Sequence, residues 1–268
     1  MAPKFPKFPN LKSYYVEVYG LTDVGLVRGN NEDVWANMSD IDTYALADGM
    51  GGHQAGEVAA QLAISTFQSQ MEKMLYAESP KKSLGDIRGN IEHVIRMVNS
   101  YVYETGCKDP ELKGMGTTFC CLYFHPQGVI YAHVGDSRIY RYRDQMLEQI
   151  TEDHSLLREL IDKGKLNKKA EKEFVYKNII TKAIGTEPYI EPSVYVSDIL
   201  PDDVYLMCTD GLSDLVTHSE IENILISGSL KDQTENLINT AKNKGGHDNI
   251  TVVLLKIKEN FDGEKNIS

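Results

Sequence analysis

The chain has no excess of positive charge. Among its 268 residues, 28 lysines and arginines stand against 39 aspartates and glutamates, and the formal net charge is −11 at pH 7. Nucleic-acid-binding domains normally carry a basic patch or stripe, so this balance argues against nucleic acid as a partner. An acidic composition alone indicates only solubility. What the acids do therefore depends on where they lie in the chain.

Long apolar runs are also lacking. No stretch approaches the roughly 20 apolar residues that cross a bilayer. The Lys-Phe-Pro repeat at residues 4–9 contains no continuous apolar segment of the kind that a signal peptide needs. We therefore expect a cytoplasmic protein that does not bind membranes. One folded domain should cover residues 13–258, between flexible tails at 1–12 and 259–268.

Cysteine is scarce. The four cysteines, Cys107, Cys120, Cys121 and Cys208, form no Cys-x-x-Cys pair, which argues against a disulfide framework and a zinc site. We expect them to be buried thiols in a reducing compartment. Cys120 and Cys121 are neighbours in an apolar run, so their side chains should point to opposite faces of a strand.

Apolar patterning predicts the secondary structure. Strands are predicted at Tyr14–Tyr19, Val34–Asn37, Thr43–Ala47, Thr117–Phe124, Val129–Val134, Arg138–Arg143, Val194–Ile199, Val204–Cys208 and Ile250–Ile257. Helical periodicity appears at Gly56–Leu75, Ile87–Tyr103, Ser219–Ser227 and Leu230–Lys244.

The predicted strands must form antiparallel sheets that are covered on both faces. Phe119–Phe124 and Ile250–Leu255 are apolar on both faces, which requires cover on each side. The link from Phe124 to Val129 has the length of a hairpin, whereas a parallel pair needs a crossover of about a dozen residues or more. We predict an α+β fold, a four-layer α-β-β-α sandwich of two antiparallel sheets flanked by helices.

One segment, Ser155–Lys177, does not fit this sandwich. It opens with an N-cap-like Asp153-His154-Ser155, followed by a short amphipathic helix at Leu156–Ile161. The segment is either a solvated pair of surface helices or an inserted, mobile flap beside a functional site.

Acids with adjacent glycines stand at the ends of several predicted strands. They are Asp48, Asp136 and Asp210. Asp248, in Gly245-Gly246-His247-Asp248-Asn249, and the pair Glu32-Asp33 each precede a further strand. Any one Asp-Gly dipeptide is typical of a turn. Together, however, acids at the ends of neighbouring strands would converge on one rim, where their mutual repulsion requires a cation.

The predicted donor set consists of oxygen atoms alone. Such a set suits Mg²⁺ or Mn²⁺ and not zinc. Two such ions close together can share a water, lower its pKa towards neutrality and polarise the oxygens of a phosphate. Arg28, just before Asn30-Asn31-Glu32-Asp33, is a candidate to hold the remaining phosphate oxygens, since its planar guanidinium matches phosphate at two points. Without these neighbours it would be an ordinary surface arginine.

These residues, in this order, resemble the metal-dependent protein phosphatases (the PPM family, protein phosphatase type 2C) in their compact bacterial form. The resemblance runs from Thr22 to Val253. Its motifs are Thr22-Asp23-Val24-Gly25, Arg28 to Asp33, Ala47 to His53 with Gly56-Glu57, Met115 to Thr118, His133 to Arg138, Thr151 to Ser155, Thr209 to Asp214 and Gly246 to Thr251.

The resemblance implies a role for each site residue. It implies the same sandwich fold and makes Asp48, Asp210 and Asp248 ligands of a first metal. Asp48 would bridge to a second metal, which also takes the Gly49 carbonyl. Glu32 and Asp33 would hold the second metal or its waters, and Asp136 with Asp210 would bind a third, weaker ion. Arg28 would grip the phosphate, and Ser155–Lys177 would be the family's flap, which is implicated in substrate choice.

The general acid is the point at which this chain departs from part of the family. Many eukaryotic members have a histidine directly after Asp-Gly, whereas this chain has Met50 there and His53 three residues later, as is usual in bacterial members. Either His53 or a metal-bound water would protonate the leaving oxygen. For His133, His154 and His247 we expect hydrogen-bonded structural roles.

The resemblance implies a serine/threonine protein phosphatase in which a hydroxide bridging two Mg²⁺ or Mn²⁺ ions attacks phosphorus directly, with a third ion at the weaker position. Ser137 and Ser213 have no base beside them in the sequence and are expected to brace turns. The expected partners are phosphorylated proteins, the targets of serine/threonine kinases and the kinase itself, and the enzyme is expected to be a monomer.

Three alternatives stay open. The same fold could act on one phosphoserine protein of a stress or sporulation switch, such as an anti-sigma-factor antagonist. A catalytically dead phosphatase fold could be a binding module, although the chain retains Asp48, Asp210 and Asp248. A calcium-binding structural protein is the third, but calcium loops usually take their ligands from one short segment.

Overall fold

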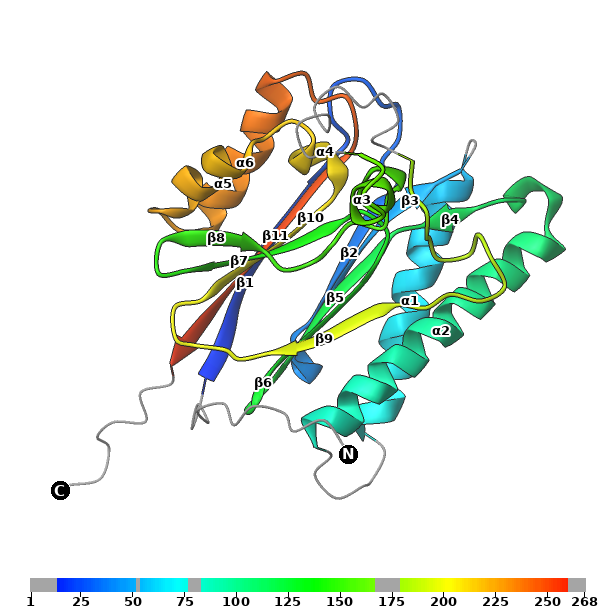
Figure 1. Ribbon diagram of the computed structural model, residues 1–268, viewed down its shortest axis with the longest axis horizontal. Coiled ribbons are helices and arrows are strands. Elements are labelled where there is room, and N and C mark those ends of the chain that lie inside the picture. Colours follow the sequence, from blue (N-terminus) through cyan, green and yellow to red (C-terminus); the bar gives the residue numbers. More distant parts are fainter. Residues whose placement is uncertain (1–13, 52–53, 77–82, 167–178, 260–268) are drawn as a thin grey trace.

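The computed structural model describes residues 14–51, 54–76, 83–166 and 179–259. Over these ranges the chain forms two β-sheets that pack face to face, with helices on the outer face of each sheet (Figure 1). Every strand pair is antiparallel. The predicted four-layer α-β-β-α sandwich is confirmed.

The first sheet has five strands in the order β1-β11-β10-β7-β8. Their bounds are Tyr14–Asp23 for β1, Ile250–Glu259 for β11, Val204–Cys208 for β10, Arg138–Arg143 for β7 and Met146–Gln149 for β8. The first and last described strands, β1 and β11, lie side by side in this sheet.

The second sheet has the order β2-β3-β5-β6-β9, and β4 pairs with the end of β3. Its strands are β2 (Asp33–Met38), β3 (Thr43–Met50), β4 (Gly116–Thr117), β5 (Phe119–His125), β6 (Gly128–Val134) and β9 (Ser193–Ser197). The short link between β5 and β6 is the hairpin that the sequence predicts.

Helices cover the outer faces of both sheets. The long helices α1 (Ala55–Tyr76) and α2 (Leu84–Lys108) pack on the second sheet, and α5 (His218–Leu225) and α6 (Leu230–Asn243) pack on the first (Figure 1). The short pieces are α3 (Leu156–Asp162), α4 (Asp210–Ser213) and the 3₁₀ turns Ser39–Ile41 and Pro110–Leu112. Capping boxes begin α2, α5 and α6, because a Ser or Thr and an acid three residues later satisfy each other's backbone N–H groups.

Alternation along the strands divides the interior into three apolar layers. In β5, Cys121 faces the α1/α2 helices, while Cys120 faces the other sheet, as predicted for neighbours in a strand. In β10, Leu206 packs under α5 and α6, while Tyr205 lies between the sheets. The prediction of four buried cysteines is wrong for Cys107, which is exposed in the last turns of α2.

The two sheets meet closely near the acid-bearing end of β2. Trp35, on β2, packs against Gly20 of β1, and a Cβ added at Gly20 would lie 2.6 Å from the indole ring. Glycine at this position therefore lets the indole reach the opposite sheet. The contact locks the two sheets together two residues from Asp33.

Several element bounds differ from prediction. The strand predicted at Thr117–Phe124 is interrupted at Thr118, whose hydroxyl and N–H bond to the backbone of Asp48. The strand β8 was not predicted, since Leu147 is its only buried residue. The helix α4 was not predicted either, because it is a single short turn that starts at Asp210.

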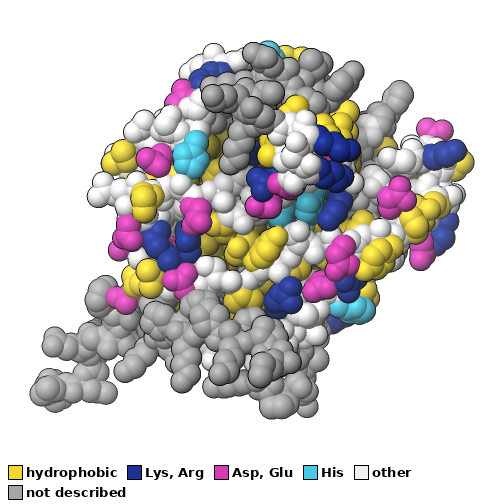
Figure 2. All heavy atoms as spheres, in the orientation of Figure 1, with side chains coloured by type: hydrophobic (Ala, Val, Ile, Leu, Met, Phe, Trp, Pro, Cys, Tyr) yellow, Lys and Arg dark blue, Asp and Glu magenta, His cyan; other side chains and the backbone are white. Residues whose placement is uncertain are grey.

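The predicted flap is described as far as Leu166. Ser155 is the N-cap of α3, and its hydroxyl accepts from the N–H of Arg158 at 3.3 Å. Basic side chains gather around α3 (Figure 2), but Arg158 pairs with Glu152 and Asp162, and Lys163 pairs with Glu159. The positive charges of Arg158 and Lys163 are therefore neutralised by acids of α3 and by Glu152, just before the segment.

Other predictions fall partly outside the described residues. These are the remainder of the flap, 167–177, and the tails at 1–12 and 259–268, apart from Glu259 at the end of β11. The domain limits of 13–258 stay a prediction. In the described ranges, no helix has the length and apolarity needed to cross a membrane.

Candidate active site

The predicted acids lie at one edge of the sandwich. Asp48 lies near the end of β3, Asp210 begins α4 two residues after the end of β10, and Asp248 lies two residues before β11. Asp33, the first residue of β2, is opposite Asp48 in the β2–β3 register. Since β10 and β11 are antiparallel, the end of one and the start of the other meet at this edge (Figure 1).

Asp48 and Asp210 perturb each other's pKa. Burial and then the charges of Asp33, Asp210, Asp136 and Asp248 raise the pKa of Asp48 well above its usual value. Burial, followed by the charges of Asp248 and Asp214, raises the pKa of Asp210 to about 6, against a hydrogen bond from Asp48. Four acids from distant parts of the chain therefore lie within electrostatic reach of Asp48.

Asp33 is buried beneath this rim, with 5% of its surface exposed. Its Oδ2 accepts from the hydroxyls of Thr209 at 2.9 Å and Thr251 at 2.7 Å. Burial outweighs these bonds, and together with the charges of Asp210 and Asp248 it raises the pKa of Asp33 to about 7.

Asp136 lies in the turn between β6 and β7. Burial, and then the charges of Asp210 and Asp153, raises the pKa of Asp136 to about 7. Arg138 is nearby but is committed to Asp153, to which it donates from both Nε and Nη2. Asp136 therefore has no cation dedicated to it among the described residues.

The backbone of Asp48 is held by two hydroxyl groups. The N–H of Asp48 donates to Thr118 Oγ1 at 3.0 Å, and the carbonyl of Asp48 accepts from Thr117 Oγ1 at 2.8 Å. Thr118 Oγ1 also bonds to Ser137 Oγ at 2.7 Å, which ties the Asp48 strand to the turn that carries Asp136. The motif Met115 to Thr118 is visible in the sequence, but the contacts that give its two threonines a role are visible only in the structure.

Glycines beside the acids allow very close packing. A Cβ at Gly49 would lie 2.1 Å from the carbonyl oxygen of Gly56, and one at Gly56 would lie 2.1 Å from Oε2 of Glu32. A Cβ at Gly211 would lie 2.0 Å from the carbonyl oxygen of Asn249. Any side chain at these positions would push the loops apart and separate the acids.

Arg28 lies at the rim and pairs with Asp248. The distance from Arg28 Nη2 to Asp248 Oδ2 is 2.7 Å, and the two side chains are 52% and 36% exposed. The hydrogen bond to Asp248 is the main cause that raises the pKa of Arg28. The predicted phosphate-gripping group is therefore beside the predicted metal acids and open to solvent.

The chemistry of these residues fits hard cations. Asp33 Oδ1 and Asp210 Oδ1 are buried oxygens without a hydrogen-bond partner in the described structure, and unpaired buried carboxylate oxygens are costly unless a cation binds them. No three described His, Cys, Asp or Glu side chains form a completed metal site, and the carboxylate of Asp248 is turned to Arg28. Among the described residues, the carboxylates therefore share one rim, but no three of them come together at one point.

The predicted histidine roles have three outcomes. His53 lies outside the described residues. His133 and His154 are structural, as expected: their rings stack at 4.5 Å, His133 Nε2 bonds the carbonyl of Glu152, and His154 Nδ1 accepts from Gly135 N–H. For His247 the expectation is wrong, since this residue is exposed and has no hydrogen bond to the described residues, its imidazole lying against Gly245.

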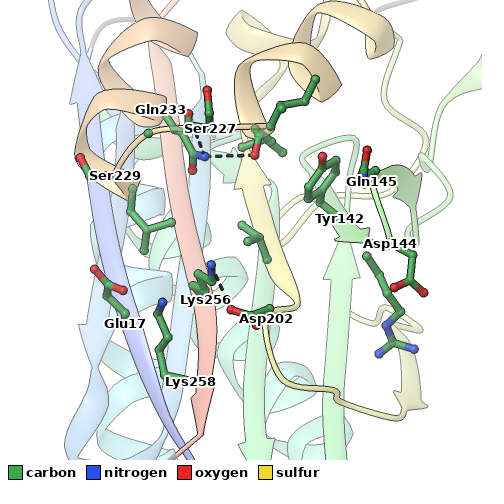
Figure 3. Close-up of a pocket in the computed structure, with 16 residues that line it drawn as sticks. Glu17, Tyr142, Asp144, Gln145, Asp202, Ser227, Ser229, Gln233, Lys256 and Lys258 are labelled. Atoms are coloured by element: carbon green, nitrogen blue, oxygen red, sulfur yellow. Dashed lines mark hydrogen bonds and ion pairs between the residues drawn. The ribbon is translucent and has the colours of Figure 1, made fainter.

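A cavity of about 690 Å³ lies at the opposite end of the first sheet. Glu17, Lys256 and Lys258 project into it from the strands, and Ser229 and Gln233 lie above them (Figure 3). It is lined at the start of β10 and the end of β11, whereas the acids stand at the other ends of these strands. This cavity does not contribute to the acid rim.

Comparison with known proteins identifies the family. Residues 29–254 match the family model described as protein phosphatase 2C. Protein phosphatase PhpP of Streptococcus pneumoniae is 36% identical over 248 residues, which cover 91% of this chain and 98% of that protein. Serine/threonine phosphatase Stp of Listeria monocytogenes is 35% identical over 242 residues, which cover 88% and 93%.

Solved structures agree with this result. The serine/threonine phosphatase PstP/Ppp of Mycobacterium tuberculosis matches with a TM-score of 0.82 and 34% identity, covering 91% of this chain and 99% of that one. The PstP catalytic domain in complex with two manganese ions matches with a TM-score of 0.80 and 33% identity, covering 92% and 100%.

The fold and the acid rim define a metal-dependent phosphohydrolase. The chain belongs to the protein phosphatase 2C family. It is a metal-dependent serine/threonine protein phosphatase, and the enzyme class predicted from the sequence is confirmed.

Proposed function

We propose that the rim binds two Mg²⁺ or Mn²⁺ ions and a third, weaker ion. Asp48, Asp210 and Asp248 would hold the first ion, and Asp48 and the Gly49 carbonyl would hold the second. Glu32 and Asp33 hold the second ion or its waters, and Asp136 with Asp210 takes the third. The placement of these acids at one edge of the sandwich supports this assignment, together with the raised pKa values of Asp48 and Asp210. Asp33 is the least direct donor, since its Oδ2 is occupied by two hydroxyls.

Ions held by these residues would supply Lewis-acid charge, which would lower the pKa of a bound water and polarise the phosphate oxygens. Arg28 orients the substrate by donating two N–H groups to its phosphate, for which it exchanges its present bond to Asp248. Ser137 does not act as a nucleophile, because its hydroxyl bonds to Thr118 and no base among the described residues forms a hydrogen bond with it. His53 is the candidate to protonate the leaving serine or threonine oxygen.

The substrates are phosphoserine and phosphothreonine proteins, including the targets of serine/threonine kinases and the kinase itself. The enzyme acts as a cytoplasmic monomer. The names of the relatives support the substrate class, since PhpP is a protein phosphatase and Stp a serine/threonine phosphatase.

The single observation that carries the proposal is the gathering of acids from β2, β3, β10 and β11 at one edge of the sandwich. The test is Asp210→Asn, assayed on a phosphoserine peptide with saturating Mn²⁺. We expect kcat/KM to fall at least about 100-fold, since even changes to groups behind metal ligands cost roughly 10- to 100-fold.

Asp144→Asn is the matched control, because Asp144 is an exposed acid in the turn at the opposite end of β7. It should keep full activity. Wild-type turnover of the Asp210 variant at every Mn²⁺ concentration would show that the metal assignment is wrong.

A further inference from the structure

Asn249, directly after Asp248, uses its side-chain amide for hydrogen bonds to the backbone of the loop at residues 24–32. Its Nδ2 donates to the carbonyls of Val24 at 3.0 Å and Asn30 at 2.9 Å, and its Oδ1 accepts from the N–H of Glu32 at 2.8 Å. The residue is 6% exposed. One buried side chain therefore closes both ends of the segment from Val24 to Glu32.

This segment is not held by an apolar core. Leu26, Val27 and Arg28 are 62%, 66% and 52% exposed. The segment is seated on the Gly246–Asn249 turn through polar and backbone contacts, including Leu26 N–H to the Gly246 carbonyl at 2.8 Å. Gly25 is so close that an added Cβ would lie 2.2 Å from the carbonyl oxygen of Asp248, and its φ of +79° also requires glycine.

We propose that Asn249 is a positioning residue for phosphate binding, which sets the place of Arg28 and Glu32 relative to Asp248. The inference rests on the proposed function of these three residues. Only an amide of this length supplies two donors and one acceptor to these three backbone groups. An aspartate would place a carboxylate against the carbonyls of Val24 and Asn30, and an alanine would leave all three groups without their partner.

The variants Asn249→Ala and Asn249→Asp test the proposal. We expect kcat/KM on an aryl phosphate to fall roughly 10- to 100-fold, because misplacement of a binding group by about 1 Å can cost that much. The loss should include a higher KM, since Arg28 binds the ground-state phosphate. The Mn²⁺ concentration for half-maximal activity should also rise, because Glu32 and Asp248 move apart.

Gln233→Ala is the matched control for destabilisation. Gln233 is 6% exposed, and its Nε2 donates to the carbonyls of Leu225 at 3.1 Å and Ser227 at 3.4 Å. It lies at the start of α6, beside the cavity at the opposite end of the first sheet from the acid rim. This variant should lower Tm in the same way as Asn249→Ala, yet keep KM and kcat. Equal kinetic losses in both variants would overturn the proposal.

Hydrogen exchange gives a readout that does not depend on activity. In metal-free protein, the amide of Glu32 should exchange faster in both Asn249 variants and remain protected in Gln233→Ala. Unchanged exchange across residues 24–32 would also overturn the proposal, even where a variant is too unstable for kinetics.

The double variant Arg28→Ala/Asn249→Ala separates this inference from the proposed function. If Asn249 acts through Arg28, its loss should add little once Arg28 is absent. If Arg28→Ala alone leaves KM unchanged, the proposed role of Arg28 fails, and the exchange experiment still decides whether Asn249 holds the loop.

Discussion

His154 should make the folded protein sensitive to mild acid. Burial, and then the charges of His133 and Lys182, lowers the pKa of His154 from 6.5 to about 3, while Glu159 opposes this shift. Gly135 N–H donates to Nδ1, so the proton of the neutral ring is on Nε2, which donates to Ser193 Oγ at 3.0 Å. Protonation of Nδ1 would break the bond to Gly135, beside the turn that carries Asp136.

The direction and size of the pH effect on stability follow from the pKa of His154 in the folded and unfolded states. Between pH 6.5 and pH 3 the unfolded chain binds a proton at His154 that the folded protein does not, so stability falls as pH falls. From pH 7.5 to pH 5 this one group removes about 2 kcal/mol from the free energy of unfolding. For a chain of this size that equals roughly 4 to 8 °C in Tm.

The assay is thermal unfolding of wild type and His154→Asn across this pH range. Asn keeps an acceptor near the position of Nδ1 but does not titrate, so the variant should lose about 2 kcal/mol less than wild type on going to pH 5. The comparison within each pH cancels the contributions of the other acids and histidines. His93→Asn, a change at an exposed histidine of α2, should follow wild type. Equal pH slopes for wild type and His154→Asn would refute the reasoning.

Three further changes should alter stability or metal-dependent activity. Thr118→Val removes the acceptor for Asp48 N–H and should lower the free energy of unfolding by about 1–3 kcal/mol. It should also weaken Mn²⁺ binding, which titration calorimetry measures. Unchanged Mn²⁺ affinity would contradict the role given to Thr118. Asp203→Ala removes a 1% exposed carboxylate that accepts two hydrogen bonds from Arg143 at 2.6 Å. Breaking such a buried pair costs about 3–5 kcal/mol, but Asp198 still pairs with Arg143 and reduces the loss, so Tm should fall by roughly 5–10 °C with kcat retained. A loss of kcat would argue against this purely structural role. A chelator should abolish hydrolysis of an aryl phosphate, and added Mn²⁺ or Mg²⁺ should restore it; activity in excess chelator would exclude the proposed metal chemistry.

The architecture could be predicted because it depends on one-dimensional patterns. Strands that are apolar on both faces, joined by short links, allow few arrangements other than two antiparallel sheets between helices. The opposite orientations of Cys120 and Cys121 follow from the same period of two. The edge strand β8 was missed because it buries only Leu147, which leaves no alternation to detect.

The gathering of the acids at one edge could be predicted from the sequence. The hydrogen bonds that hold these acids in place could not. An acid after an apolar strand is visible in the sequence, and adjacent strands bring such acids to one edge. The roles of Thr118, Thr209 and Thr251 depend on which group each hydroxyl faces across the fold, and a hydroxyl in a motif does not reveal its partner. The ion pair of Arg28 with Asp248 joins residues 220 positions apart, so only the structure could show it.

The wedge of Trp35 against Gly20 gives the enzyme a built-in optical reporter. This is the only tryptophan in the chain, and it follows Asp33 by two residues along β2. Its fluorescence therefore comes from a single place, where the two sheets touch two residues from Asp33. We expect a cation that binds at the acid rim to change this emission, which would report binding in the unlabelled protein without any substrate.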